Sequence, residues 1–179
     1  MRPIYLIGYM GCGKTTLGRA VAAVARTRFV DLDEYIEQRE GESITEIFAR
    51  RGESAFRAIE REALNELSGE SDIIIATGGG TPCQPGLMDI MLATGVTVHL
   101  DTPIDVLHRR LVEGRQQRPL IASLDDEQLL SFITNSLERR IESYSRAKYR
   151  FDSSLLESPS QVSSSVKLFI RKFISHDPE

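Results

Sequence analysis

Eight residues near the N-terminus have the spacing of a phosphate-binding loop. Gly8 and Gly13 precede Lys14 and Thr15 in the pattern G-x-x-x-x-G-K-[ST], between an aliphatic run at 4–7 and a helical pattern. Glycines let backbone N–H groups face phosphate oxygens, and the lysine reaches the outer phosphates of a nucleoside triphosphate. A glycine-rich turn with a surface lysine is the alternative, but the complete pattern in this frame favours nucleotide binding.

The loop also contains a cysteine and ends in two threonines. Cys12 is either a thiol activated by the helix N-terminus or a small residue that the loop tolerates, and we expect the second. The Thr15 hydroxyl can ligate Mg²⁺. The residues expected to contact ATP in this segment are Gly11, Cys12, Gly13, Lys14, Thr15 and Thr16.

Two carboxylates, Asp31 and Asp33, stand at the end of the apolar run 29–32. Side chains two apart on a strand share a face, so we expect both in front of the phosphate loop. One can organise Mg²⁺ through water, and the other can accept a hydrogen bond from an acceptor hydroxyl. Acids that only cap a helix or interact with solvent are an equal alternative.

Three consecutive glycines, 78–80, follow the apolar run 73–76. They lie at the carboxyl edge of a predicted sheet, where α/β proteins bind ligands. Because three glycines cost backbone entropy, close approach of a ligand explains them better than packing does, with a sharp structural turn as the alternative.

Three arginines complete the set of candidates. Arg57 has Glu60 three residues later on a predicted helix, a spacing that can hold its guanidinium in one orientation. Arg118 lies in segment 113–123, which has no apolar period and is expected to form a mobile lid. Arg140 lies on a long predicted helix. A solvated surface arginine is the alternative for each.

The elements that must position these residues follow a βαβ pattern. Short apolar runs alternate with longer amphipathic stretches, which predicts a parallel sheet covered by helices on both faces. The five expected strands are 4–7, 29–32, 73–76, 96–100 and 149–151. We therefore expect one α/β domain over residues 1–179, with three layers and a central five-stranded parallel sheet.

The helix ends are marked by capping signals. Ser43 and Glu46 form a predicted capping box, Gly52 ends that short helix, and Thr102 is expected to cap a helix that has Pro103 at its first position. The apolar residues expected to face inward include Leu17, Val21 and Val24, Ile104, Leu107 and Leu111, and Leu130, Ile133, Leu137, Ile141 and Tyr144.

Composition excludes several classes of protein. The 179 residues include 22 basic and 26 acidic ones, a net charge of −4, which argues against nucleic-acid binding by bulk charge. Two cysteines are too few for a disulfide scaffold, and no apolar run is long enough to cross a membrane. No Asn-Lys-x-Asp guanine-binding motif and no transporter ATPase signature is present. With no leader pattern, we expect a cytoplasmic protein.

Taken together, the chain resembles the shikimate kinase family over about residues 4–173. The resemblance rests on the phosphate loop, the F-x-D-x-D segment at 29–33, F-R-x-x-E at 56–60, the triple glycine, R-P-L at 118–120 and R-x-x-x-Y at 140–144. It implies a P-loop kinase domain similar to nucleoside monophosphate kinases, with substrate-binding helices at about 33–62. It also implies transfer of the ATP γ-phosphoryl group to the 3-hydroxyl of shikimate.

The resemblance further implies a role for each candidate. Asp33 would hold the acceptor hydroxyls and assist as base, and Lys14 and Arg118 would neutralise the transferring phosphoryl group. Thr15 would ligate Mg²⁺ with Asp31 in its outer shell. Arg110 would stack on adenine beside the loop near Pro159. The implied shikimate contacts are Asp33, Phe48, Phe56, Arg57, Gly78, Gly79, Gly80 and Arg140.

Two other functions stay open at this point. A gluconate-type or nucleoside monophosphate kinase shares the phosphate loop and lid, and a regulatory nucleotide-binding module would share the loop without catalysis. Glu142 stands where the family often has proline, and Ile121 replaces a common leucine. The expected partners are shikimate and ATP, without nucleic acid or membrane, and the absence of an association seam favours a monomer.

Overall fold

The computed structural model describes residues 1–174. The strands are β1 (Ile4–Ile7), β2 (Arg28–Asp31), β3 (Ile73–Ala76), β4 (Val96–Asp101) and β5 (Tyr149–Asp152). The helices are α1 (Lys14–Ala25), α2 (Leu32–Glu40), α3 (Ile44–Ser68), α4 (Leu87–Thr94), α5 (Ile104–Glu113), α6 (Asp126–Ser145) and α7 (Pro159–Phe173). Two short 3₁₀ helices, η1 (Thr81–Cys83) and η2 (Arg115–Gln117), lie between them.

All five strands are parallel, in the order β2-β3-β1-β4-β5, which confirms the predicted sheet. β1 and β3 are neighbours, but the connection after β1 leads to β2 at one edge and the connection after β3 leads to β4 on the other side. Such a switch point opens a crevice at the carboxyl ends of the strands. The phosphate loop follows β1 and the triple glycine follows β3, so the topology brings both to this crevice.

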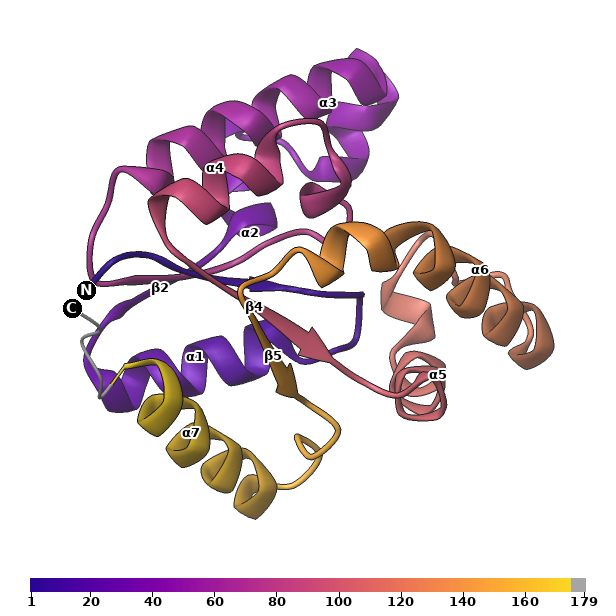
Figure 1. Cartoon of the computed structure of the whole chain (residues 1–179). Helices are drawn as coiled ribbons and strands as arrows, with labels where there is room; N and C mark the ends of the chain where they lie inside the picture. The colour runs from indigo at the N-terminus through magenta and orange to yellow at the C-terminus, as the bar shows by residue number, and fades with distance from the viewer. Residues whose placement is uncertain (175–179) are drawn as a thin grey trace.

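Alternating residues of the strands divide the interior into two cores. In β1, Ile4 and Leu6 pack with α1, α5, α6 and α7, whereas Tyr5 and Ile7 pack with α2, α3 and α4. Figure 1 shows the same three layers, with α3 and α4 on one face of the sheet and α1 and α7 on the other. The three-layer expectation is therefore confirmed.

The capping signals are confirmed at one helix and wrong at another. Ser43 and Glu46 form the capping box of α3, and Gly52 has left-handed φ (78°) at a kink inside that helix. The prediction for Thr102 is wrong, because Pro103 is the N-cap of α5 and the Thr102 hydroxyl is instead 2.6 Å from the Ser153 hydroxyl. Helix α5 therefore begins one residue later than expected.

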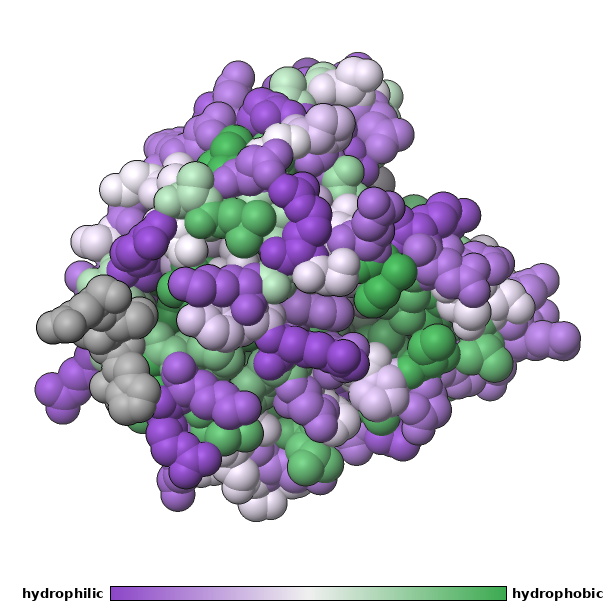
Figure 2. All heavy atoms as spheres, in the orientation of Figure 1, coloured by the Kyte–Doolittle hydropathy of each residue, from purple (hydrophilic) through white to green (hydrophobic). Residues whose placement is uncertain are grey.

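Four apolar residues expected to face inward are exposed: Val24, Ile104, Leu130 and Ile141. Each lies at the margin of its helical stripe, and the buried positions of the same helices include Val21, Leu107, Ile133 and Tyr144. Apolar residues gather on the face shown in Figure 2 over the region of α5 and α6, where Ile104 and Ile141 are 38% and 50% exposed. The apolar periodicity identified the helices correctly, but it assigned to the buried face four residues that lie beside that face and are exposed.

Candidate active site

The phosphate loop has the backbone that its glycines allow. Gly8, Gly11 and Gly13 have φ values of 144°, 78° and 95°. A Cβ at Gly8 would lie 2.8 Å from the Leu100 carbonyl oxygen, so any other residue at position 8 would collide with that oxygen. Lys14 Nζ donates hydrogen bonds to the carbonyl oxygens of Gly8 (2.8 Å) and Tyr9 (3.0 Å). The lysine ammonium is therefore held over the loop, beside the site expected for phosphates.

Asp31 and Asp33 meet in front of the loop, but for a reason different from the predicted one. β2 ends at Asp31, and Leu32, which was expected to extend the strand, is the first residue of α2. Asp31 is the N-cap: its Oδ1 accepts from the Asp33 amide (3.2 Å), and its Oδ2 accepts from the Thr15 hydroxyl (2.8 Å). The prediction that the two acids share one face of a strand is therefore wrong. The N-cap of α2 brings them together instead.

Burial and neighbouring acids raise the pKa of Asp33 to about 6. Desolvation is the largest cause, followed by repulsion from Asp31 and from Glu60, while Lys14 opposes the shift. A carboxyl group with this pKa is mostly ionised at neutral pH yet accepts a proton more readily than an ordinary aspartate. Asp33 also lies beside the triple glycine, since a Cβ at Gly78 would be 3.1 Å from its Oδ1.

A buried carboxylate holds the first arginine of the site. Glu60 is 1% exposed and accepts hydrogen bonds from Thr81, Gln84 and Arg57, the last at 3.1 Å from Arg57 Nη1. Thr81 and Gln84 follow the triple glycine, so Glu60 ties α3 to that turn. The predicted pairing of Arg57 with Glu60 is confirmed, and it points the guanidinium toward Gly80, whose Cβ would lie 3.7 Å from Arg57 Nη1.

A pair of phenylalanines lies next to this arginine. The rings of Phe48 and Phe56 have centroids 4.6 Å apart, and the Arg57 guanidinium lies 5.3 Å from the Phe56 ring centroid. Phe56 is buried, whereas Phe48 is 37% exposed. This arrangement provides an apolar surface beside a cation, which suits a small molecule with a hydrocarbon ring and an anionic group.

The second arginine, Arg140, approaches the triple glycine from α6. A Cβ at Gly79 would lie 3.1 Å from Arg140 Nη1, and the Arg140 guanidinium lies 5.4 Å from the Tyr9 ring centroid. Tyr144, one turn later, donates a hydrogen bond of 2.6 Å to the Gly79 carbonyl oxygen. Arg57 and Arg140 both line a cavity of about 650 Å³ together with Gly80. Two guanidinium groups at one cavity form a site for a carboxylate.

A second cavity, of about 390 Å³, lies on the nucleotide side of the loop. It is lined by Gly11, Gly13, Lys14, Thr15, Thr16, Arg110, Glu113, Arg118, Leu156 and Glu157. Arg118 Nη1 donates to the Gly114 carbonyl oxygen (2.9 Å). Arg110 donates to the carbonyl oxygens of Ser153 (3.1 Å) and Ser154 (2.9 Å). The structure therefore gathers the predicted nucleotide residues, apart from the side chain of Cys12, around one cavity.

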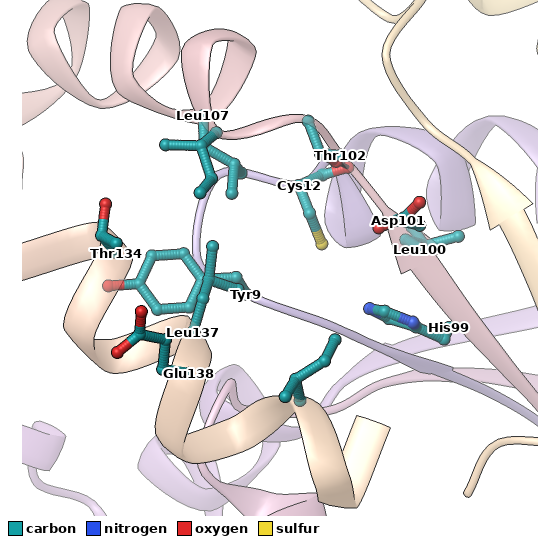
Figure 3. A pocket seen from close by; sticks show the side chains of 12 residues that line it. Tyr9, Cys12, His99, Leu100, Asp101, Thr102, Leu107, Thr134, Leu137 and Glu138 are labelled. Atoms are coloured by element: carbon teal, nitrogen blue, oxygen red, sulfur yellow. Dashed lines mark hydrogen bonds between the residues drawn. The ribbon is translucent and has the colours of Figure 1, made fainter. Parts of the chain in front are cut away.

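Cys12 faces a different cavity, of about 300 Å³, behind the loop. Figure 3 shows Cys12, Leu107 and His99 around this space, which is also lined by Tyr9 and Leu137. Cys12 is 1% exposed, and its sulfur lies 3.7 Å from Lys14 Nζ. Cys12 can therefore contribute to nucleotide binding only through its backbone.

The structure brings the sequence-predicted residues to one edge of the sheet, in two groups. One group surrounds Lys14 and the other surrounds Asp33 and the two arginines. Asp31 joins them, because it accepts hydrogen bonds from the Thr15 hydroxyl and from the Asp33 amide. The contacts of Glu60 with Thr81 and Gln84, and of Tyr144 with Gly79, were not predicted. For Tyr144, the four-residue spacing from Arg140 was the available signal.

The residues present fit a magnesium ion that also binds phosphates. Thr15 and Asp31 offer only oxygen donors, and their direct hydrogen bond places both at the end of the phosphate loop. Among residues 1–174, no cluster of three or more His, Cys, Asp or Glu side chains could hold a metal. Mg²⁺ at such sites keeps several waters and binds substrate phosphates, so it needs only one or two protein oxygens such as those of Thr15 and Asp31.

Among the described helices, none is both long and apolar enough to span a bilayer.

Comparison with known proteins places this geometry in one family. The family model described as shikimate kinase matches residues 10–171. A shikimate kinase of Phocaeicola vulgatus is 45% identical over 172 residues, which cover 96% of this chain and 98% of the relative.

Two solved structures share the fold in detail. The structure of shikimate kinase from Bacteroides thetaiotaomicron is 44% identical, with a TM-score of 0.92, and the match covers 95% of this chain and 97% of that one. Shikimate kinase from Acinetobacter baumannii, solved in complex with shikimate, is 32% identical, with a TM-score of 0.79 and coverage of 96% and 92%.

The raised pKa of Asp33 predicts an effect on stability. Its folded pKa (about 6) exceeds the ordinary 3.8, so ionisation destabilises the folded state as pH rises from about 4 to 6, and the full cost remains above that range. Asp33→Asn should therefore raise Tm by a few degrees at pH 7.5 and by much less at pH 4.5. Thermal unfolding at both pH values measures this difference.

Asp105→Asn provides the matched control, because Asp105 also lies in the first turn of a helix but is exposed. Loss of its favourable interaction with the helix dipole should leave Tm unchanged or slightly lower at pH 7.5. Equal Tm shifts of Asp33→Asn at the two pH values would contradict a raised pKa of Asp33 in the folded state.

Proposed function

Because the chain belongs to the shikimate kinase family, we infer that it is an ATP-dependent kinase that phosphorylates the 3-hydroxyl of shikimate. The observation that carries this proposal is the pair of arginines, Arg57 and Arg140, beside the triple glycine and close to Asp33. A planar carboxylate is best bound by guanidinium groups, and an acceptor hydroxyl needs a nearby carboxylate.

ATP occupies the cavity around Lys14 in this proposal. The loop N–H groups and the N-terminus of α1 bind the phosphates, and Arg110 stacks on adenine beside the segment that leads to Pro159. The backbone contacts of Arg110 with Ser153 and Ser154 support this role, because they hold its guanidinium at the rim of the cavity. Thr15 would hold Mg²⁺ together with the phosphates, with Asp31 beside it, and the ion would supply charge neutralisation on the phosphates.

Phosphoryl transfer depends mainly on positioning and on neutralising charge. Lys14 and Arg118 both line the nucleotide cavity, so their cations can approach the transferring group. We propose that segment 113–123 acts as a lid that carries Arg118 and excludes water when both substrates are bound. Exclusion of water limits transfer of the phosphoryl group to water instead of to the acceptor.

On the acceptor side, Asp33 accepts a hydrogen bond from the 3-hydroxyl. It takes the hydroxyl proton as the oxygen bonds to the γ-phosphorus and the bond from that phosphorus to the bridging oxygen breaks, which releases ADP. Arg57 and Arg140 bind the carboxylate, with Gly78, Gly79 and Gly80 supplying close backbone approach. Phe48 and Phe56 contact the ring of the substrate. The substrate-binding region is then about 33–62, that is, α2 and the first part of α3.

Residues 1–179 act in this proposal as one domain and as a cytoplasmic monomer without a nucleic-acid or membrane partner. The net charge of −4 supports the absence of a nucleic-acid partner.

An acceptor assay is the first test of the activity. With ATP and Mg²⁺, ADP should form in the presence of shikimate and not with gluconate or nucleoside monophosphates, because among these acceptors only shikimate combines a carboxylate with a ring hydroxyl. The readout is ADP release, with omission of acceptor as the control. Turnover of another acceptor with no turnover of shikimate would refute the proposal. Tight ATP binding without turnover of any acceptor would indicate a regulatory nucleotide-binding module.

Arg57 and Arg140 form the proposed carboxylate clamp, which predicts that their loss affects the KM for shikimate but not the KM for ATP. Arg57→Ala and Arg140→Ala should each raise KM for shikimate by about tenfold or more, because a charge-assisted hydrogen bond is lost, and should change KM for ATP by less than about threefold. Arg61→Ala is the matched control, since Arg61 lines the same cavity but donates to the Pro85 carbonyl oxygen. Equal rises in both KM values would show that these residues do not form a carboxylate clamp.

The role of Asp33 predicts a pH dependence. Protonation removes the base, so kcat/KM for shikimate should fall about tenfold per unit as pH decreases below about 6. Asp33→Asn keeps the shape but cannot accept the proton, so it should lower kcat by about 100-fold or more and abolish this decline. Any pH effect that arises from ionisation of the substrates should persist in Asp33→Asn. If the pH profile of this variant equals that of the wild type, Asp33 is not the base.

A further inference from the structure

Tyr144 is a buried residue of α6 that the proposed mechanism does not use. It is 0% exposed, and its hydroxyl donates a 2.6 Å hydrogen bond to the carbonyl oxygen of Gly79, 65 residues earlier in the chain. Its ring packs on His99 of β4 with centroids 5.1 Å apart. Ring and hydroxyl are therefore both fixed, and the residue connects α6 to the turn after β3.

The partner of this hydrogen bond lies at the centre of the acceptor site. A Cβ at Gly79 would lie 3.1 Å from Arg140 Nη1 and 3.6 Å from the Gly8 carbonyl oxygen. Gly79 is thus between the clamp arginine and the start of the phosphate loop. A shift of this turn relative to α6 would change the distance between Arg140 and the rest of the site.

Arg140 and Tyr144 are four residues apart on one helix, so their side chains leave the same face. Burial raises the pKa of the Tyr144 hydroxyl, and the nearby positive charge of Arg140 opposes part of this shift. The hydroxyl therefore remains protonated at neutral pH and remains a donor to Gly79. Both side chains therefore reach the turn at Gly79 from one face of α6.

We propose that Tyr144 is a positioning residue for the acceptor: its hydrogen bond to Gly79 holds Arg140 at the distance that the substrate carboxylate requires. It touches no reacting atom and acts through Arg140. This inference rests on the proposed function, because it assigns Tyr144 to the same carboxylate clamp.

The test is Tyr144→Phe, which removes only the hydroxyl. KM for shikimate should rise about tenfold, while KM for ATP and kcat should each change by less than about threefold, because the phosphate loop and Asp33 keep their contacts. KM does not depend on the fraction of enzyme that is folded, so partial unfolding of the variant would not disturb the comparison.

Tyr5→Phe is the matched control. Tyr5 is also 0% exposed, and its hydroxyl lies 2.8 Å from that of Thr94, away from the acceptor site. This control should lower Tm to a similar extent and leave KM for shikimate unchanged. If Tyr144→Phe lowers Tm without raising KM for shikimate, or raises both KM values equally, the positioning role is overturned.

A double-mutant cycle separates positioning from a general structural role. In an Arg140→Ala background, Tyr144→Phe should raise KM for shikimate by less than about twofold, because the group it positions is absent. A repeated tenfold rise would overturn the proposal. Wild-type enzyme that does not turn over shikimate would refute the proposed function itself, whereas normal wild-type turnover with an unaltered Tyr144→Phe variant refutes only this inference.

Discussion

The acceptor half of the site depends on the burial of one charge, the carboxylate of Glu60. A charge removed from water is tolerated only when its hydrogen bonds are satisfied, and Glu60 obtains them from Thr81, Gln84 and Arg57. Burial and Asp31 contribute most to the raised pKa of Asp33, and repulsion from Glu60 adds to them. A single buried acid therefore connects α3 to the glycine turn, orients one arginine and adds to the basicity of Asp33.

Both cavities of the candidate site are lined by more basic than acidic side chains, although the chain is slightly acidic. The net charge of −4 does not reveal that Lys14, Arg57, Arg118 and Arg140 all line these two cavities. Many of the other arginines form exposed ion pairs on the outer helices, such as that of Arg39 with Glu62, and such pairs add little to stability. Overall charge thus argues against nucleic-acid binding by bulk charge but says little about a small anionic ligand, for which the local arrangement matters.

Local chemistry determined which features could be predicted from the sequence. The phosphate loop, the capping box of Ser43 and the pairing of Arg57 with Glu60 involve residues within a few positions of one another, and all were predicted correctly. The parallel sheet was also predicted, because buried strands are continuous apolar runs. Leu32 was assigned to a strand because it extends such a run, but Asp31 caps a helix at that point. The contact between Tyr144 and Gly79 spans 65 residues and follows from tertiary packing, so the spacing of Tyr144 from Arg140 could single out the tyrosine but not its partner.

The hydrogen bonds of Lys14 within its own loop have a consequence for energetics. Because Nζ is bound to the Gly8 and Tyr9 carbonyl oxygens, the lysine has already lost much of its rotamer freedom when the chain is folded. The entropy cost of ordering this side chain is therefore part of the free energy of folding and not of the free energy of binding. Nucleotide binding then loses less of its interaction energy to the ordering of Lys14. Domain stability and nucleotide affinity are consequently linked at this loop: a substitution that loosens it would weaken both together.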